Sequence, residues 1–263
     1  MTGDEVRHRV VNGVSWLTLD RPEALNALTP GGRERLVSLL SEASADPAVR
    51  AVVITATGSA FCAGADLRAA PDGRERVAGD IARLIRRGAQ RLITSVLDCE
   101  KPVIAAVNGT AAGLGVHLAL ACDLVIAAEE ARFIEVFTRR GLVPDGGGAY
   151  LLPRLIGPQR AKELMFFGDA LSARDAERWG LVNRVVPAPE LEKTAHAWSA
   201  RLATGPTRAL SLTKHLVNAA LDTDRTTALA AEAAAVELAM TTHDANEGVA
   251  SFRERRGARF EGR

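Results

Sequence analysis

The sequence predicts an α/β fold with mostly parallel strands, followed by an all-helical C-terminal region. Up to about residue 187, short apolar runs rich in β-branched residues alternate with longer segments of helical period, and after Pro187 the short runs stop. Such alternation is typical of parallel sheets with right-handed crossover connections. A doubly wound sheet and a coiled spiral of β/α turns both fit this pattern. The length of 263 residues is enough to bury a sizeable core.

The N-terminal elements follow from turn chemistry and from periodicity. Asn-Gly at 12–13 lies between the apolar runs Val6–Val11 and Val14–Asp20, which predicts a hairpin of two antiparallel strands. The segment Arg33–Ala45 carries its apolar residues on a helical period, so we expect a helix there. The continuous apolar run 51–55 predicts a strand that is buried on both faces.

The middle of the chain repeats this alternation. We expect, in order, a helix from about Arg74 to Leu97, a strand at 102–107, a helix near Leu114–Ala121, a strand at 123–128, and helices around Gly146–Ile156 and Pro158–Phe167. The run 102–122 contains no charged residue. Because Asn108, His117 and several glycines interrupt it, we expect a buried strand, loop and helix there and no membrane span.

Charge and cysteine content exclude several classes of protein. The 33 basic and 32 acidic residues give a net charge of +1, so no overall field favours nucleic acid or an anionic membrane. The three cysteines are widely spaced and form neither a metal motif nor a disulfide framework. The first residues contain no apolar signal segment. We therefore expect a cytoplasmic protein with reduced thiols and no bound metal.

Three glycine-containing turns follow strand-like runs, at 58–67, at 108–117, and at 141–150 after the run 133–137. In α/β sheets, ligands bind at the carboxyl ends of strands, where such turns gather, and glycine lets backbone amides approach a ligand closely. The turns match neither a P-loop nor G-x-G-x-x-G, and no serine lies in G-x-S-x-G. This disfavours nucleotide hydrolysis, dinucleotide chemistry and triad hydrolysis.

Four stretches carry a family resemblance, namely "FCAGADL", "PVIAAVNGTAAGLGVHLALACDLVIAA", "ARFIEVFTRRGLVPDGGGAYLLPRLIG" and "GDALSARDAERWGLVNRVV". With the helical tail, they resemble the enoyl-CoA hydratase/isomerase family, the crotonases, over about residues 5–260. The resemblance implies a crotonase-like spiral of β/α turns over 1–190 and a helical region over 191–263 that holds a homotrimer or a dimer of trimers. It also implies an acyl-CoA thioester as substrate and no separate cofactor, because coenzyme A arrives with the substrate.

The resemblance also assigns backbone roles. The N–H groups of Ala65 and Leu114 would hold the thioester carbonyl, and a helix start such as Leu114 offers an unpaired donor and the positive end of the helix dipole. The backbone around the adenine and pantetheine of coenzyme A would come from five positions, which are Ala24, Ala27, Ala63, Asp66 and Leu67. These contacts are mostly main chain, so side-chain identity there carries little information.

The chain departs from the hydratase pattern at both catalytic glutamates. Their positions align with His117 and Phe137, which we assign, together with Gly115 and Pro144, to substrate contact. Ring-type isomerases of the family carry an acid in "GLVPD", and here that acid is Asp145. One carboxylate suffices to remove a proton next to the thioester and return it at another carbon. Asp145 is therefore the candidate acid/base.

Several alternatives stay open. Asp145 could instead cap a helix that starts at Gly146. Glu135 precedes Phe137 by two residues, so strand alternation puts both on one side, and either His117 or Glu135 could assist. For function we expect an isomerase that shifts a double bond or rearranges a ring, with an enoyl-CoA hydratase and a non-catalytic acyl-CoA-binding protein as alternatives. A dehalogenase is disfavoured because the first turn lacks the histidine that family dehalogenases need.

Overall fold

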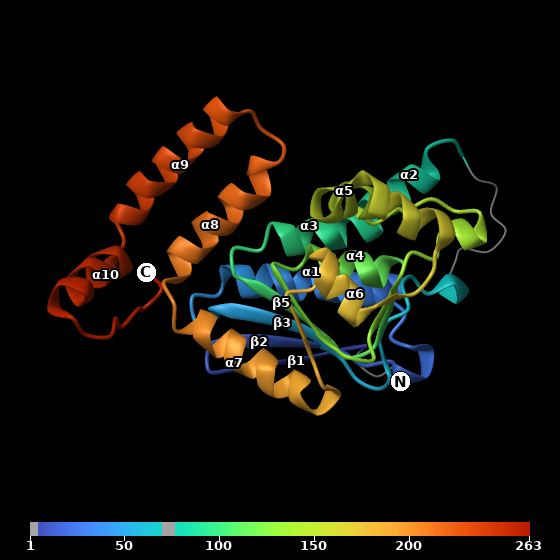
Figure 1. The fold of residues 1–263 in the computed structure, drawn as a ribbon, viewed down its shortest axis with the longest axis horizontal. Helices are drawn as coiled ribbons and strands as arrows, with labels where there is room; N and C mark the ends of the chain where they lie inside the picture. Colours follow the sequence, from blue (N-terminus) through green and yellow to red (C-terminus); the bar gives the residue numbers. More distant parts are fainter. Residues whose placement is uncertain (1–4, 70–76) are drawn as a thin grey trace.

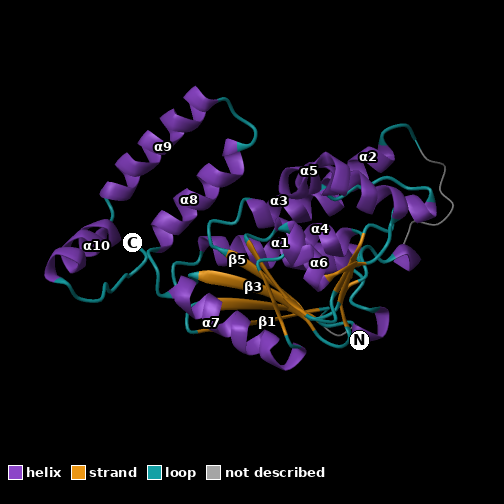
Figure 2. Ribbon diagram, in the orientation of Figure 1, coloured by secondary structure: helices purple, strands orange, loops and turns teal. Residues whose placement is uncertain are grey.

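The computed structural model describes residues 5–69 and 77–263 and contains two β-sheets enclosed by helices (Figures 1 and 2). The larger sheet has the order β1-β2-β3-β5-β7-β10, and the smaller has the order β4-β6-β8-β9. Strands of the larger sheet are β1 Val6–Val11, β2 Val14–Leu19, β3 Ala51–Ala56, β5 Val103–Val107, β7 Leu124–Ala128 and β10 Arg184–Val186. Strands of the smaller sheet are β4 Ala60–Cys62, β6 Thr110–Ala112, β8 Arg132–Ile134 and β9 Leu171–Ser172.

Three successive segments place one strand in each sheet and then form a helix, and this repetition makes the core a spiral. The strand pairs are β3 with β4, β5 with β6, and β7 with β8. Pairing is parallel throughout the larger sheet except between β1 and β2. The choice that the sequence pattern left open is therefore decided in favour of the spiral of β/α turns.

Helices surround the sheets as follows: α1 Pro30–Ala45, α2 Asp80–Ile85, α3 Arg91–Leu97, α4 Leu114–Ala121, α5 Gly148–Phe167, α6 Ala173–Trp179, α7 Leu191–Ala203, α8 Thr207–Ala220, α9 Arg225–Met240 and α10 His243–Glu254. Alternate residues of β3 enter different clusters, with Val52 and Ile54 in the main core and Val53 in a second core that includes Leu191 of α7. The strand is thus buried on both faces, as predicted, and α7 covers one face of the sheet (Figure 2).

Most predicted elements are confirmed, with shifted ends. The hairpin turn has Asn12 and Gly13 at φ 51° and 76°. Helix α1 begins three residues before the predicted Arg33, because Thr29 accepts a hydrogen bond from Gly32 N at 3.0 Å and so caps the helix. Helix α5 breaks at Gly157, where φ is 79°, which reproduces the two predicted helices.

Two expectations need correction. The strand predicted at 133–137 ends at Ile134, because the chain turns there and Val136 N donates to Ile134 O at 3.1 Å. The helix predicted from Arg74 to Leu97 is interrupted by a π-helical turn, Arg86–Gln90, between α2 and α3. The start predicted at Arg74 lies outside the described residues.

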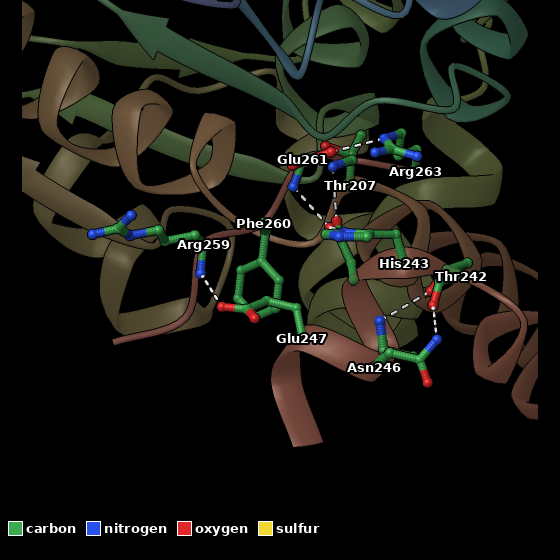
Figure 3. A network of polar contacts seen from close by, with 12 residues as sticks. Thr207, Thr242, His243, Asn246, Glu247, Arg259, Phe260, Glu261 and Arg263 are labelled. Atoms are coloured by element: carbon green, nitrogen blue, oxygen red, sulfur yellow. Dashed lines mark hydrogen bonds and ion pairs between the residues drawn. The ribbon is translucent and has the colours of Figure 1, made fainter. Parts of the chain in front are cut away.

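The C-terminal helices α8, α9 and α10 extend away from the spiral, whereas α7 packs on it (Figure 1). The division at residues 190 and 191 stays a prediction. The last residues return to α10, where Glu247 accepts from Arg259 N at 2.7 Å (Figure 3). Asp244 accepts from Glu261 N at 2.7 Å. Within the described ranges, no helix combines the length and apolarity that a bilayer crossing requires.

Candidate active site

Ala65 forms a single parallel β-bridge with Leu28, and this bridge points the N–H of Ala65 away from Leu28. Leu28 N donates to Gly64 O at 2.8 Å, and Asp66 N donates to Leu28 O at 3.0 Å. In a parallel bridge the residue between these two contacts has its own N–H on the opposite side. A Cβ on Gly64, which has φ +98°, would lie 3.4 Å from Leu114 N. The first glycine turn therefore lies directly against the start of α4.

Leu114 is the first residue of α4, so its N–H has no acceptor within the helix. The preceding N-cap, Gly113, has φ 52° and ψ −121° and makes no side-chain capping bond. Gly115 permits the close approach of α4 to β4, because a Cβ there would lie 2.1 Å from Cys62 O. Ala65 and Leu114 thus present two backbone donors from adjacent turns, an arrangement that suits a developing oxyanion.

Asp145 is half-buried in the third glycine turn and does not cap α5. The helix begins at Gly148, its N-cap is Gly147 at φ 85°, and no side chain caps it. The expectation of a helix starting at Gly146 and capped by Asp145 is therefore wrong, because the chain needs two further residues to turn into the helix. Burial raises the pKa of the Asp145 carboxyl above its ordinary value of 3.8, while His117, the residue's own N–H and Arg33 oppose the rise.

His117 lies one helical turn after Leu114 and is fully buried. Its Nε2 lies 3.2 Å from Glu135 Oε2, and its ring stacks on Phe137 with centroids 5.3 Å apart and planes at 9°. Glu135 and Phe137 thus both contact the side chain of His117, although the backbone turns away after β8 ends at Ile134. Of the other predicted contacts, Pro144 is partly exposed beside Asp145, and Gly115 backs onto Cys62.

Arg33 is a charged neighbour of this site that the sequence analysis missed. It lies on α1, and its guanidinium is 3.8 Å from where Gly88 of the π-helical turn would carry a Cβ. Burial lowers the pKa of Arg33, and the Asp145 carboxylate opposes that change. Nothing in the local sequence of α1 signals this electrostatic interaction, because Arg33 and Asp145 are far apart in the chain.

The five predicted coenzyme A positions lie on two adjoining segments. The loop that contains Ala24 and Ala27 pairs with 63–66 through the neighbouring residues Leu25 and Leu28, and Ala63 N donates to Leu25 O at 2.9 Å. The buried Asn26 holds this loop, because its Nδ2 donates to Thr57 O and Ala60 O, both at 2.8 Å. Sequence reasoning missed Asn26, whose role depends on its left-handed φ of 56°.

The Asp66 carboxylate is occupied by two arginines. Arg68 donates to it at 3.0 Å and Arg21 at 3.2 Å, and these hydrogen bonds hold the pKa of Asp66 well below its usual range. Leu67, the next residue, exposes 56% of its surface. Because the N–H of Asp66 already donates to Leu28 O, only the backbone carbonyl of Asp66 could meet a ligand, whereas Leu67 can offer both backbone and side chain. No group of three or more His, Cys, Asp or Glu within the described ranges could hold a metal ion.

A two-sheet spiral in which the first glycine turn packs against the start of α4 is the fold of the crotonase class of enzymes. The sequence model of the enoyl-CoA hydratase/isomerase family matches residues 9–263, and the chain belongs to this family. It is 39% identical to the 1,2-epoxyphenylacetyl-CoA isomerase of Escherichia coli over 254 residues, 97% of each chain. It is 37% identical to the crotonyl-CoA hydratase of Syntrophomonas wolfei over 245 residues, 93% of each chain.

A solved structure agrees with this assignment. The crystal structure of enoyl-CoA hydratase from Bacillus anthracis superimposes with a TM-score of 0.90 at 34% identity, covering 98% of this chain and all of the other. Relatives named as isomerases and as hydratases thus match this chain at similar sequence identity. The family is therefore established, whereas the choice between the two reactions depends on the site.

Proposed function

We propose that the protein is a cytoplasmic acyl-CoA isomerase in which Asp145 moves a proton between two carbons of the acyl group. The supporting observation is the half-buried Asp145 carboxylate in the turn that packs against His117 and Leu114. The two positions that carry glutamates in hydratases are His117 and Phe137 here. Coenzyme A would enter as part of the thioester substrate, with no separate cofactor.

In this proposal the carboxylate of Asp145 removes a proton from the carbon next to the thioester. The electron pair moves into the carbonyl, and the N–H groups of Ala65 and Leu114 hold the resulting enolate oxygen. Removing one such donor typically costs about 3–4 kcal/mol of transition-state stabilisation. A positioned acid/base contributes about 10²–10⁴-fold. Return of a proton at the fourth carbon of a 3-enoyl chain completes the shift of the double bond to the second and third carbons.

The test is to incubate the protein with 3-enoyl-CoA and, separately, with 2-enoyl-CoA in deuterated water. We expect double-bond migration with deuterium entering the fourth carbon when 3-enoyl-CoA is the substrate and the carbon next to the thioester when 2-enoyl-CoA is, reduced at least ~100-fold in Asp145→Asn. The matched control is Asp169→Asn, because Asp169 is 78% exposed and pairs with Arg139 on the surface. Water addition that continues undiminished in Asp145→Asn would overturn the proposal.

Hydration is the second candidate, and the His117–Glu135 contact favours it. The His117 imidazole, at the position of the first hydratase glutamate, contacts the Glu135 carboxylate. This pair could therefore serve as a second acid/base group beside Asp145. The same experiment separates the two reactions. Formation of 3-hydroxyacyl-CoA from 2-enoyl-CoA at a rate above that of migration would favour the hydratase.

We further propose that copies of this chain cover α9. The helix buries none of its residues within the chain, and several of its large apolar side chains are more than half exposed, including Leu229, Val236, Leu238 and Met240. Such an apolar helix surface needs a partner in water. Light scattering should give a mass three or six times 27.9 kDa, whereas a particle of 27.9 kDa would contradict the proposal.

A further inference from the structure

The contact between His117 and Glu135 buries two ionisable side chains almost completely, with exposures of 0% and 2%. Nε2 of His117 lies 3.2 Å from both carboxylate oxygens, but only the approach to Oε2 has hydrogen-bond geometry. Phe137 stacks on the imidazole and removes water from that face. The pair therefore keeps a fixed orientation in an apolar surrounding.

Each partner has one polar atom without a hydrogen bond in the described part of the chain. These atoms are Nδ1 of His117 and Oε1 of Glu135. Buried polar atoms in folded proteins nearly always have a partner, because leaving them unpaired costs free energy. Two unpaired atoms on one contacting pair therefore indicate that a substrate atom or a water molecule satisfies them.

The position of Nδ1 favours a role in the reaction. It lies 2.9 Å from where Gly146 would carry a Cβ, and Gly146 directly follows Asp145. The same Cβ would lie 2.5 Å from Cδ1 of Leu114, the residue whose N–H begins α4. Nδ1 thus lies against the backbone residue that directly follows Asp145, where the side chain of Leu114 also packs. Nε2 lies at the other end of the ring, against Gly148.

We propose that His117 is a second acid/base group of this active site and that Glu135 is the residue that positions it. The assignment rests on the acyl-CoA isomerase function proposed above. Glu135 accepts the Nε2 proton and so fixes the tautomer, which leaves Nδ1 as the atom that exchanges a proton. Without Glu135, the imidazole could present either nitrogen to the substrate.

The proton balance of the two-group reaction is as follows. The Asp145 carboxylate takes the proton from the carbon next to the thioester, that C–H bond breaks, and its electrons form the conjugated enolate. The imidazolium Nδ1–H then donates its proton to the fourth carbon, where a new C–H bond forms while the double bond settles between the second and third carbons and the carbonyl is restored. The Asp145 carboxyl returns one proton to Nδ1 through a water molecule, and both groups regain their starting states.

Two rates in deuterated water test this division of labour. With 3-enoyl-CoA, deuterium exchange at the carbon next to the thioester needs only Asp145, whereas migration of the double bond needs both groups. In His117→Gln we expect exchange within about threefold of the wild type and migration at least ~100-fold slower. In Glu135→Gln, which keeps the shape of the side chain, we expect migration about tenfold slower. His215→Gln, at an exposed position on α8, serves as the control.

Nitrogen NMR of ¹⁵N-histidine protein gives a readout independent of turnover. We expect Glu135 to hold the proton of His117 on Nε2 in the wild type, and the two tautomers to mix in Glu135→Gln. Migration in His117→Gln within threefold of the wild type overturns the proposal. So does an equal loss of exchange and migration, which marks a structural pair bridged by water. Wild-type protein that neither exchanges nor migrates overturns the isomerase function, and this assignment with it.

Discussion

The imidazole of His117 occupies the space in which any other residue at Gly148 would carry its side chain. A Cβ at Gly148 would lie 2.1 Å from Nε2 of His117, far inside van der Waals contact. A Cβ at Gly146 would likewise lie 2.9 Å from Nδ1 of His117. Gly147, between these two glycines, has φ +85°. Glycine is therefore required at all three positions after Asp145. Gly146 and Gly148 leave space for the His117 ring, and Gly147 adopts the left-handed conformation of the turn.

Replacing Gly148 by alanine should displace the imidazole from Glu135. Inserting a methyl group into a filled space typically costs about 1–3 kcal/mol, and we also expect the isomerase rate to fall. Urea unfolding and steady-state rates measure the two effects. Gly257→Ala is the control, since no atom lies within 4 Å of a Cβ there. An unchanged urea midpoint in Gly148→Ala would show that the His117 imidazole can move aside without loss of stability.

The rate should rise with pH as Asp145 loses its proton. Because burial raises the pKa of Asp145, the midpoint of kcat/KM should lie above 3.8. Arg33 stabilises the carboxylate, so Arg33→Gln should move this midpoint to higher pH. Arg35→Gln, on the same helix and paired with Glu42, should leave it in place. A midpoint that moves downward in Arg33→Gln would contradict the electrostatic role of Arg33.

Asp145→Asn should stabilise the fold at pH 7 while removing activity. Burial raises the pKa of Asp145 in the folded state, so at pH values above about 3.8 the folded state binds more protons than the unfolded state. The free energy of unfolding therefore falls as the pH rises above about 3.8. The gain should therefore be present at pH 7 and shrink toward pH 3.8 in urea unfolding. Asp175→Asn should act in the opposite direction, because Ser172 and Arg178 lower the pKa of Asp175. If Asp145→Asn and Asp175→Asn change the free energy of unfolding at pH 7 in the same direction, this explanation is refuted.

Lys214 attaches the extended helical region to the spiral. Its Nζ lies 2.9 Å from Asp123 Oδ2 and donates to Val96 O at 2.9 Å, with the lysine side chain 7% exposed. Lys214→Met removes this ion pair and the bond to Val96 O, although Asp123, whose side chain is 22% exposed, keeps its bond from Val103 N, so we expect a loss of about 1–3 kcal/mol in the free energy of unfolding. Lys193→Met removes a surface pair with Glu190, 79% exposed on the lysine side, and should change stability by less than ~1 kcal/mol. Similar losses for both would argue against the buried anchor.

Periodicity and turn chemistry predicted most elements because they depend on near neighbours. Asn12 and Gly13 encode their hairpin, and the helix at Leu114–Ala121 was predicted with its observed bounds. The end of β8 and the π-helical turn were missed, since both depend on how distant segments pack. The capping role of Asp145 was wrong for the same reason, because Gly147 makes the turn that fixes where α5 begins.

By itself, the sequence determined the α/β class, the family resemblance and the lone acid in "GLVPDGGG", because these reside in local pattern and residue identity. The resemblance also predicted the spiral of β/α turns, which the structure confirms, whereas periodicity alone left a doubly wound sheet open until the two sheets were seen. Only the tertiary structure decided that Glu135 meets His117, and that Arg33 from α1 acts on Asp145. The physical reason is that such contacts are formed by backbone turns at glycines and by burial, which bring together residues that are far apart in the chain.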